Sequence, residues 1–107
     1  MKNYQNFYRK ARRKAVDFPV ELKLVEHGGR LLTAGRARIA DLSPEGALLV
    51  DVQLDTEGYP HQSFQIELQI KEGPYRGIGF LCAPVRFDPV RKGVGVRVLE
   101  TYLEEQG

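Results

Sequence analysis

The chain has 107 residues, of which 42% are hydrophobic and 9% aromatic, enough for one small core and too many for a disordered protein. Six of its 16 Lys and Arg residues fall within residues 1–14, which hold none of the 14 Asp and Glu residues. We therefore expect a mildly acidic body with a basic N-terminal arm, and such an arm favours an anionic partner. No apolar run approaches membrane-spanning length and no signal-peptide core follows the basic residues, so membrane insertion is not expected.

Apolar and polar residues alternate through most of the body, which is the pattern of half-buried strands. Six segments show it: residues 20–24, 35–39, 48–52, 64–70, 78–87 and 94–98. The segment 78–87 is the most apolar, and we expect it to be covered on both faces. Gly, Pro and Asp residues separate the segments, which indicates hairpin-like turns. Together these features predict an all-β fold, either a six-stranded antiparallel β-barrel or a tight sandwich.

The two ends of the chain depart from this alternation. We expect a single domain over residues 1–107, with a flexible basic arm at 1–14, a barrel at 15–99 and a short C-terminal helix or tail at 100–107. Tyr102 and Leu103 would pack on the barrel. The one cysteine, Cys82, lies in an apolar run and indicates a buried thiol in a reducing, cytoplasmic protein.

A basic motif of the form RxxxR occupies residues 9–13, RKARR. Guanidinium groups bind phosphates and the O6 and N7 edge of guanine, because paired planar donors meet paired acceptors. A basic run of this kind also suits a solvated terminus or a nonspecific nucleic-acid patch. The arm alone leaves these alternatives open.

An acidic motif of the form DxSxxG occupies residues 41–46, DLSPEG, between the second and third predicted strands. A carboxylate suits the N1 and N2 edge of guanine, which presents hydrogen-bond donors only. The same residues also suit a plain turn, since Asp and Ser cap turns, Pro presets φ and Gly accepts positive φ. A chain that carries both motifs has the chemistry to hold a guanine nucleotide with its phosphates.

In this order, the two motifs resemble those of the PilZ domain family, whose members bind the bacterial second messenger cyclic di-GMP. The resemblance extends over nearly the whole chain, including the hydrophobic strand after DLSPEG and the closing GVGVRV segment. It implies a six-stranded β-barrel of PilZ type with the ligand across its rim. By this resemblance, Arg9 and Arg13 contact phosphates and guanine. Asp41 and Ser43 take the donor-rich guanine edge, while Gly46 allows the turn and the close approach of the ligand.

Residues between the two motif arginines vary in the family, and we expect Arg12 to add a contact in this chain; the resemblance implies that Tyr8 influences whether one or two ligand molecules bind. It implies a stand-alone, non-enzymatic receptor with no other cofactor. From the charge of the arm we expect cyclic di-GMP to order it and so to signal to a downstream protein. Two alternatives remain, a PilZ-like protein adaptor without ligand response and a barrel that binds nucleic acid through its arm. The tyrosines are not spaced as a base-stacking platform, which disfavours nucleic acid.

Catalytic and metal sites are not expected. His27 and His61 lie in predicted turns without a second ligand at metal-binding spacing, and no nucleophile can be paired with a base. Arg36 and Arg38 share one face of a predicted strand. That face is either a plain solvated surface or an extension of a basic rim.

Overall fold

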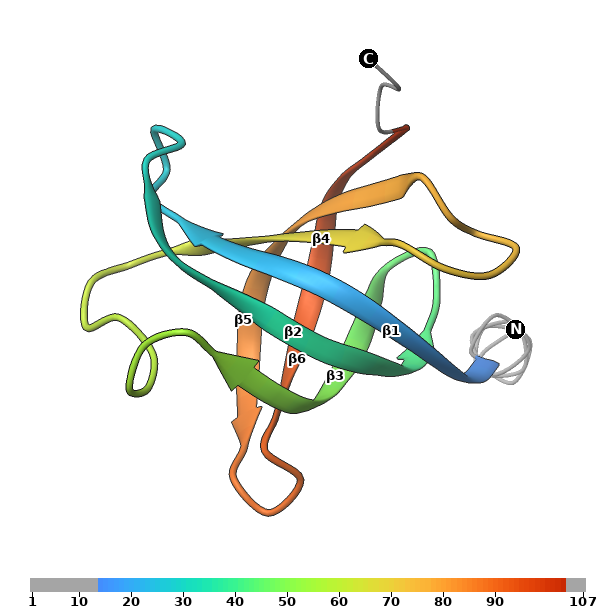
Figure 1. Cartoon of the computed structure of the whole chain (residues 1–107), viewed down its shortest axis with the longest axis horizontal. Helices are drawn as coiled ribbons and strands as arrows, with labels where there is room; N and C mark the ends of the chain where they lie inside the picture. Colours follow the sequence, from blue (N-terminus) through green and yellow to red (C-terminus); the bar gives the residue numbers. More distant parts are fainter. Residues whose placement is uncertain (1–13, 104–107) are drawn as a thin grey trace, which may run out of the picture.

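The computed structural model of the protein describes residues 14–103, and that range contains six strands and no helix (Figure 1). The strands are β1 (Lys14–Val25), β2 (Leu31–Leu42), β3 (Gly46–Leu54), β4 (Gln65–Ile70), β5 (Ile78–Asp88) and β6 (Gly93–Leu103). All pairings are antiparallel, and the sheet closes in a ring in the order β1-β2-β3-β6-β5-β4 because β4 also pairs with β1. The predicted all-β, six-stranded antiparallel fold is confirmed. The ring is not a regular barrel, since β3 and β6 pair only through residues 46–49 and 94–97.

The alternation of the sequence explains which side chains fill the ring. In β4, Ile66, Leu68 and Ile70 are buried, whereas Glu67 and Gln69 between them are partly exposed. Burying one such aliphatic side chain contributes about 1.5–3 kcal/mol. The fully buried aliphatic side chains come from β1, β2, β3, β4 and β6: Leu24, Ile39, Leu49, Ile66, Leu68, Ile70 and Val94. The core therefore lies inside the ring, and most polar residues of the strands face outward, with the buried Thr33 of β2 as an exception.

The connection between β3 and β4 is not a hairpin, so the expectation of hairpin-like turns throughout was wrong at this point. β3 pairs with β2 and β6, and β4 pairs with β1 and β5. The connecting residues 55–64 carry Tyr59, whose ring stacks on the buried Phe64 at 6.0 Å between centroids. This crossing is what allows the sheet to close with β3 beside β6.

The C-terminal end of the described chain is strand, so the predicted helix is wrong for residues 100–103. These residues pair with β5, and Tyr102 is opposite Gly79. A methyl group at Gly79 would overlap the Tyr102 ring, which shows how closely the two strands pack. Residues 104–107 lie outside the described range. Between residues 14 and 103, no helix is long and apolar enough to cross a membrane.

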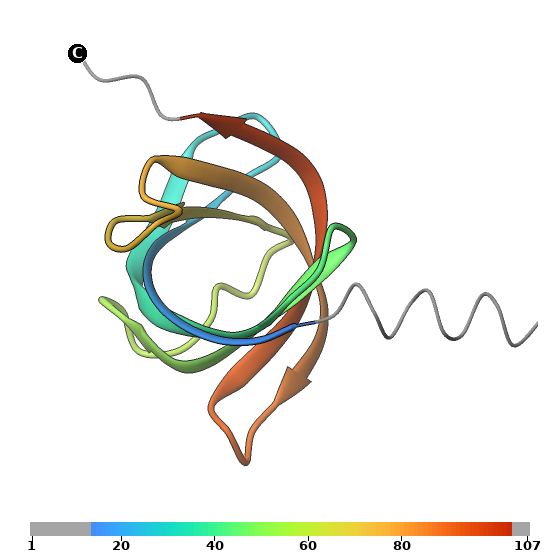
Figure 2. The ribbon, with the colours of Figure 1, turned by 90° about the vertical axis from the view of Figure 1, so that its right-hand side faces the viewer.

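The far end of β5 is exposed, contrary to the expectation that residues 78–87 are covered on both faces. Val85 and Phe87 expose 67% and 48% of their surface, although Cys82 is fully buried. The reason is that this end pairs with β6 alone and projects from the ring as a hairpin, seen at the bottom of Figures 1 and 2. We call residues 84–93 the β5–β6 hairpin.

Candidate functional site

The start of β1 lies beside the turn that carries the acidic motif. Lys14 pairs with Leu42 and Ala15 pairs with Asp41. In Figure 2 the start of β1 and the green β2–β3 turn lie on the same side of the ring. The predicted ligand residues Tyr8, Arg9, Arg12 and Arg13 lie outside the described residues. Lys14, the first described residue after them, lies next to the acidic motif.

Residues 43–46 form a tight turn that the Ser43 side chain holds. The backbone N–H groups of Glu45 and Gly46 donate to Ser43 Oγ at 3.3 and 3.2 Å, and the Ser43 N–H donates to the Gly46 carbonyl at 2.9 Å. The Ser43 hydroxyl also donates to that carbonyl at 3.3 Å. Ser43 therefore caps the turn, which is one of the two roles that the sequence allowed for it.

A glycine in a turn usually supplies a positive φ, but Gly46 is needed here for another reason. Its φ is not in the left-handed region, unlike those of Gly29, Gly58, Gly73 and Gly77. A methyl group at Gly46 would overlap the carbonyl oxygen of Val96 on β6. Gly46 therefore permits the close approach of β3 and β6 that closes the ring.

A row of paired residues crosses the outer side of the sheet from the acidic motif. Asp41 of β2 pairs with Leu48 of β3, which pairs with Gly95 of β6. Gly95 in turn pairs with Arg86 of β5. Directly paired residues point to the same face of a sheet, and the buried neighbour Val96 shows that this row faces outward. Four strands thus bring the carboxylate of Asp41 and the guanidinium of Arg86 onto one surface.

A groove of about 360 Å³ lies along this row, and we call it the turn groove. It is lined by Asp41, Ser43, Pro44, Glu45, Gly46, Ala47, Leu48, Val85, Arg86, Gly95, Val96 and Arg97. Gly46 and Gly95 contribute no side chains to it. The groove therefore has a shallow floor, with Asp41 and Glu45 at the turn, Arg97 beside the turn opposite Gly46, and Arg86 on β5.

The two arginines of the turn groove are exposed, and neither guanidinium forms an ion pair with another described residue. By contrast, Arg38 pairs with Asp17 and Arg36 hydrogen-bonds Gln53 at 3.4 Å. Those two arginines hold polar partners on the outer face of β2. Free guanidinium donors at a groove suit an anion or the acceptor edge of a purine.

Sequence reasoning missed Arg86 and Arg97 because both are far from the two motifs along the chain. The alternation in the GVGVRV segment does indicate which face of the strand Arg97 occupies. If Val94 and Val96 face the core, then Gly95 and Arg97 must share the outer face. The sequence did not show that this face adjoins the acidic motif, because that depends on β6 pairing with β3.

Metal-ligand groups and the one cysteine can be assessed within the range that the structure describes. No group of three or more His, Cys, Asp or Glu side chains between residues 14 and 103 could hold a metal ion. Burial raises the pKa of the Cys82 thiol to about 12, which keeps it protonated and unreactive at neutral pH. The chemistry that the turn groove offers is recognition through hydrogen bonds and charge.

No model of a known protein family matches this chain, and no curated protein matches it. Any functional reading therefore depends on the two sequence motifs and on the geometry of the turn groove.

Proposed function

We propose that this protein is a non-enzymatic, cytoplasmic receptor for cyclic di-GMP, built on a six-stranded barrel of the PilZ type, and that the ligand lies in the turn groove. The observation that carries the proposal is the pairing of Lys14 with Leu42, which joins the basic arm to the body beside Asp41. This attachment point supports a site that draws on both motifs.

Covalent geometry limits how far Arg13 can be from the acidic motif. Adjacent Cα atoms are about 3.8 Å apart, and paired antiparallel residues have Cα atoms about 4.5–5.5 Å apart. Arg13 precedes Lys14, so its Cα lies within about 10 Å of the Leu42 Cα in any conformation. Arg9 is five residues from Lys14 and can extend at most about 18 Å from it. Both arginines of the motif can reach a ligand in the turn groove.

The charges around the turn groove match a guanine dinucleotide with two phosphates. Asp41 offers a carboxylate for the donor edge of guanine, and the arm offers guanidinium groups for phosphate. Arg86 and Arg97 add two cations to the lining of the groove. Its volume of about 360 Å³ is at the small end of the range for ligand pockets, about 300–1,000 Å³. The arm would then cover the exposed side of the ligand.

Signalling follows from the charge of the arm. Six basic residues and no acid within residues 1–14 repel one another in the free protein. A doubly anionic ligand neutralises part of this charge and draws the arm onto the turn groove, which changes the surface shown to a downstream protein. Ordering the arm offsets part of the binding energy.

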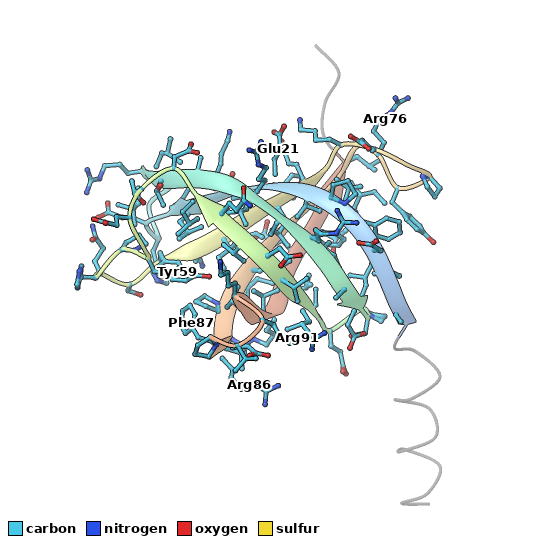
Figure 3. The ribbon with its side chains drawn as sticks, turned by 60° about the horizontal axis from the view of Figure 1, so that its bottom comes forward. Glu21, Tyr59, Arg76, Arg86, Phe87 and Arg91 are labelled. Carbon is cyan, nitrogen blue, oxygen red and sulfur yellow. The ribbon has the colours of Figure 1, made fainter. Side chains whose placement is uncertain are left out.

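Calorimetric titration of cyclic di-GMP tests the proposal. We expect saturable binding near micromolar affinity, about −8 kcal/mol, that is lost in Arg13→Ala and Asp41→Ala. Arg76→Ala is the matched control, because Arg76 is exposed at the opposite end of the molecule from Arg86 (Figure 3). GTP and a short single-stranded oligonucleotide serve as competing ligands.

Two results would overturn the proposal. An absence of heat with cyclic di-GMP would favour a protein adaptor without ligand response. Salt-sensitive binding of the oligonucleotide that is unchanged in Asp41→Ala would favour a nucleic-acid-binding arm.

A further inference from the structure

Gly95 lies inside β6, although the packing of the described residues does not require a glycine there. Its φ is outside the left-handed region. A Cβ added at Gly95 would meet one atom within 4 Å, the carbonyl oxygen of Arg86, at the ordinary contact distance of 3.8 Å. The other glycines of the described strands differ, because a methyl group would overlap a neighbouring atom at Gly35, Gly46, Gly79 and Gly93. Packing therefore explains those four glycines and leaves Gly95 unexplained.

A glycine inside a strand weakens the strand, because it loses more conformational freedom on folding than alanine and packs no side chain. Such a glycine often marks a place where a ligand approaches the backbone closely. Gly95 is partly exposed and lines the turn groove, between Leu48 on β3 and Val85 on β5. The bare backbone of β6 thus forms a flat floor between two apolar side chains.

A β-bulge in β5 determines which side chain stands opposite Gly95. The pairing of β5 with β6 shifts between Pro84 and Arg86, so that Val85 is an extra residue and Arg86 pairs with Gly95. In a regular ladder Val85 would be opposite Gly95, and Arg86 would be opposite Val94, which is buried in the core. Bulges re-aim side chains in this way and are frequent next to functional sites. The bulge therefore brings a guanidinium, rather than a valine alone, to the turn groove.

The two sides of the Gly95 floor carry opposite hydrogen-bonding chemistry. Asp41 lies two strands away on one side, and Arg86 lies on the neighbouring strand on the other. Three pairings separate these two residues, so their Cα atoms are about 14–16 Å apart along the row. Once both side chains extend over the floor, the space between them suits one flat ring with a hydrogen bond of about 2.9 Å at each edge.

Guanine matches this arrangement at both edges. Its O6 and N7 atoms are acceptors for a guanidinium, and its N1 and N2 edge presents donors for a carboxylate. Adenine carries an amino donor at N6 where guanine has the O6 acceptor. An adenine on the same floor would therefore set a donor against the guanidinium of Arg86.

We propose that one guanine of the ligand lies flat on the backbone at Gly95, with Arg86 hydrogen-bonded to O6 and N7, and that Arg86 thereby selects guanine over adenine. Asp41 takes the opposite edge of the same base. This assignment rests on the proposed function, because the base belongs to cyclic di-GMP. Arg97 has a different role: it pairs with Gly46 and Ala83, outside the row that holds the base, so it contributes charge without reading the base.

Gly95→Ala tests the floor, because it adds one methyl group to the turn groove at a position where the fold has room for it. In calorimetric titration of the full chain, the affinity for cyclic di-GMP should fall at least about fivefold, as for extra volume forced into a packed contact. The urea midpoint of unfolding should equal that of the unmodified protein or exceed it. Gly28→Ala is the matched control, since its methyl group also has room and Gly28 does not line the groove. It should keep the affinity of the unmodified protein.

Titration of cyclic di-AMP beside cyclic di-GMP tests the reading of the base. The unmodified protein should bind cyclic di-GMP more tightly. Arg86→Ala should reduce the ratio of the two affinities at least about fivefold, which is the discrimination that one bidentate contact provides. Arg97→Ala removes an equal charge from the same groove, so it should weaken both ligands and leave their ratio unchanged.

An unchanged affinity in Gly95→Ala would overturn the floor, and so would a lower urea midpoint, which would show that the fold itself needs the glycine. An unchanged ratio in Arg86→Ala, or an equal fall of the ratio in Arg97→Ala, would overturn the selection of guanine by Arg86. In each of these cases cyclic di-GMP still binds the unmodified protein, and the proposed function stands. If the unmodified protein binds no cyclic di-GMP, the proposed function fails and this assignment fails with it.

Discussion

Arg86 and Phe87 are consecutive in the chain and face opposite sides of β5. Arg86 pairs with the partly exposed Gly95 and lines the turn groove, whereas Phe87 pairs with the buried Val94 and contacts Tyr59. The pleat of a strand imposes this separation, since successive side chains point to opposite faces. One short segment thus links a polar, charged groove to an apolar contact between two rings. A movement of this backbone would shift both side chains together.

Arg86→Ala and Arg97→Ala should each weaken binding of cyclic di-GMP. A guanidinium contact with guanine contributes about 1–3 kcal/mol, so we expect a loss of about 5- to 150-fold for each variant that removes such a contact. The loss should shrink at higher salt, because both side chains are exposed. Calorimetry at two salt concentrations, with Arg76→Ala as control, measures it. Affinities equal to that of the control would place the ligand outside the turn groove.

Gly46→Ala should destabilise the protein even without ligand. The added methyl group would overlap the Val96 carbonyl oxygen, so β3 and β6 must move apart. Forcing extra volume into a packed site costs about 1–3 kcal/mol of the free energy of unfolding. Denaturation in urea measures the change, with Gly28→Ala as matched control. A methyl group at Gly28 meets no atom within 4 Å, so stability there should hold or rise by about 0.4–1 kcal/mol.

Stability should fall with pH in the alkaline range because of Cys82. Burial raises the thiol pKa from 9.0 to about 12, so above pH 9 the unfolded chain loses a proton that the folded protein keeps. The free energy of unfolding then falls by up to about 1.4 kcal/mol per pH unit until the folded thiol also ionises. Urea denaturation between pH 8 and pH 10, where the decline begins, measures this slope. In Cys82→Ala this part of the slope should be absent, although the variant is less stable at every pH.

Glu26 should titrate far below an ordinary carboxyl group. A side-chain hydrogen bond from Arg30, and a weaker one from Gln62, lower its pKa from 4.5 to about 2. A lowered pKa stabilises the fold above pH 4.5, and that contribution is lost as the pH falls through about 2. Carboxyl chemical shifts in an NMR titration give the pKa directly. In Arg30→Gln the midpoint should rise toward 4.5, and an unchanged midpoint would show that the Arg30 contact is absent in solution.

The strands themselves could be predicted because their pattern is local. Alternation in residues 64–70 marks a half-buried strand whichever neighbours it has, and β4 forms there, at Gln65–Ile70. The end of β5 and the chain beyond residue 99 were predicted wrongly for a shared reason. Val85 and Phe87 are exposed because β4 pairs with β5 only as far as Cys82, and Tyr102 is in a strand because β6 pairs along β5 back to Ile78. The length over which two strands pair leaves no local pattern to detect.

The candidate site also has one part that the sequence predicts and another that depends on the tertiary structure. The sequence by itself determined that residues 41–46 make a turn and that the basic arm precedes a strand; because β1 and β2 are consecutive and antiparallel, the arm joins the body at that turn. Only the tertiary structure decided that Arg86 and Arg97 line the same groove as Asp41. Closure through β3 and β6 brings them there, and Gly46 permits that closure because it has no side chain to meet Val96.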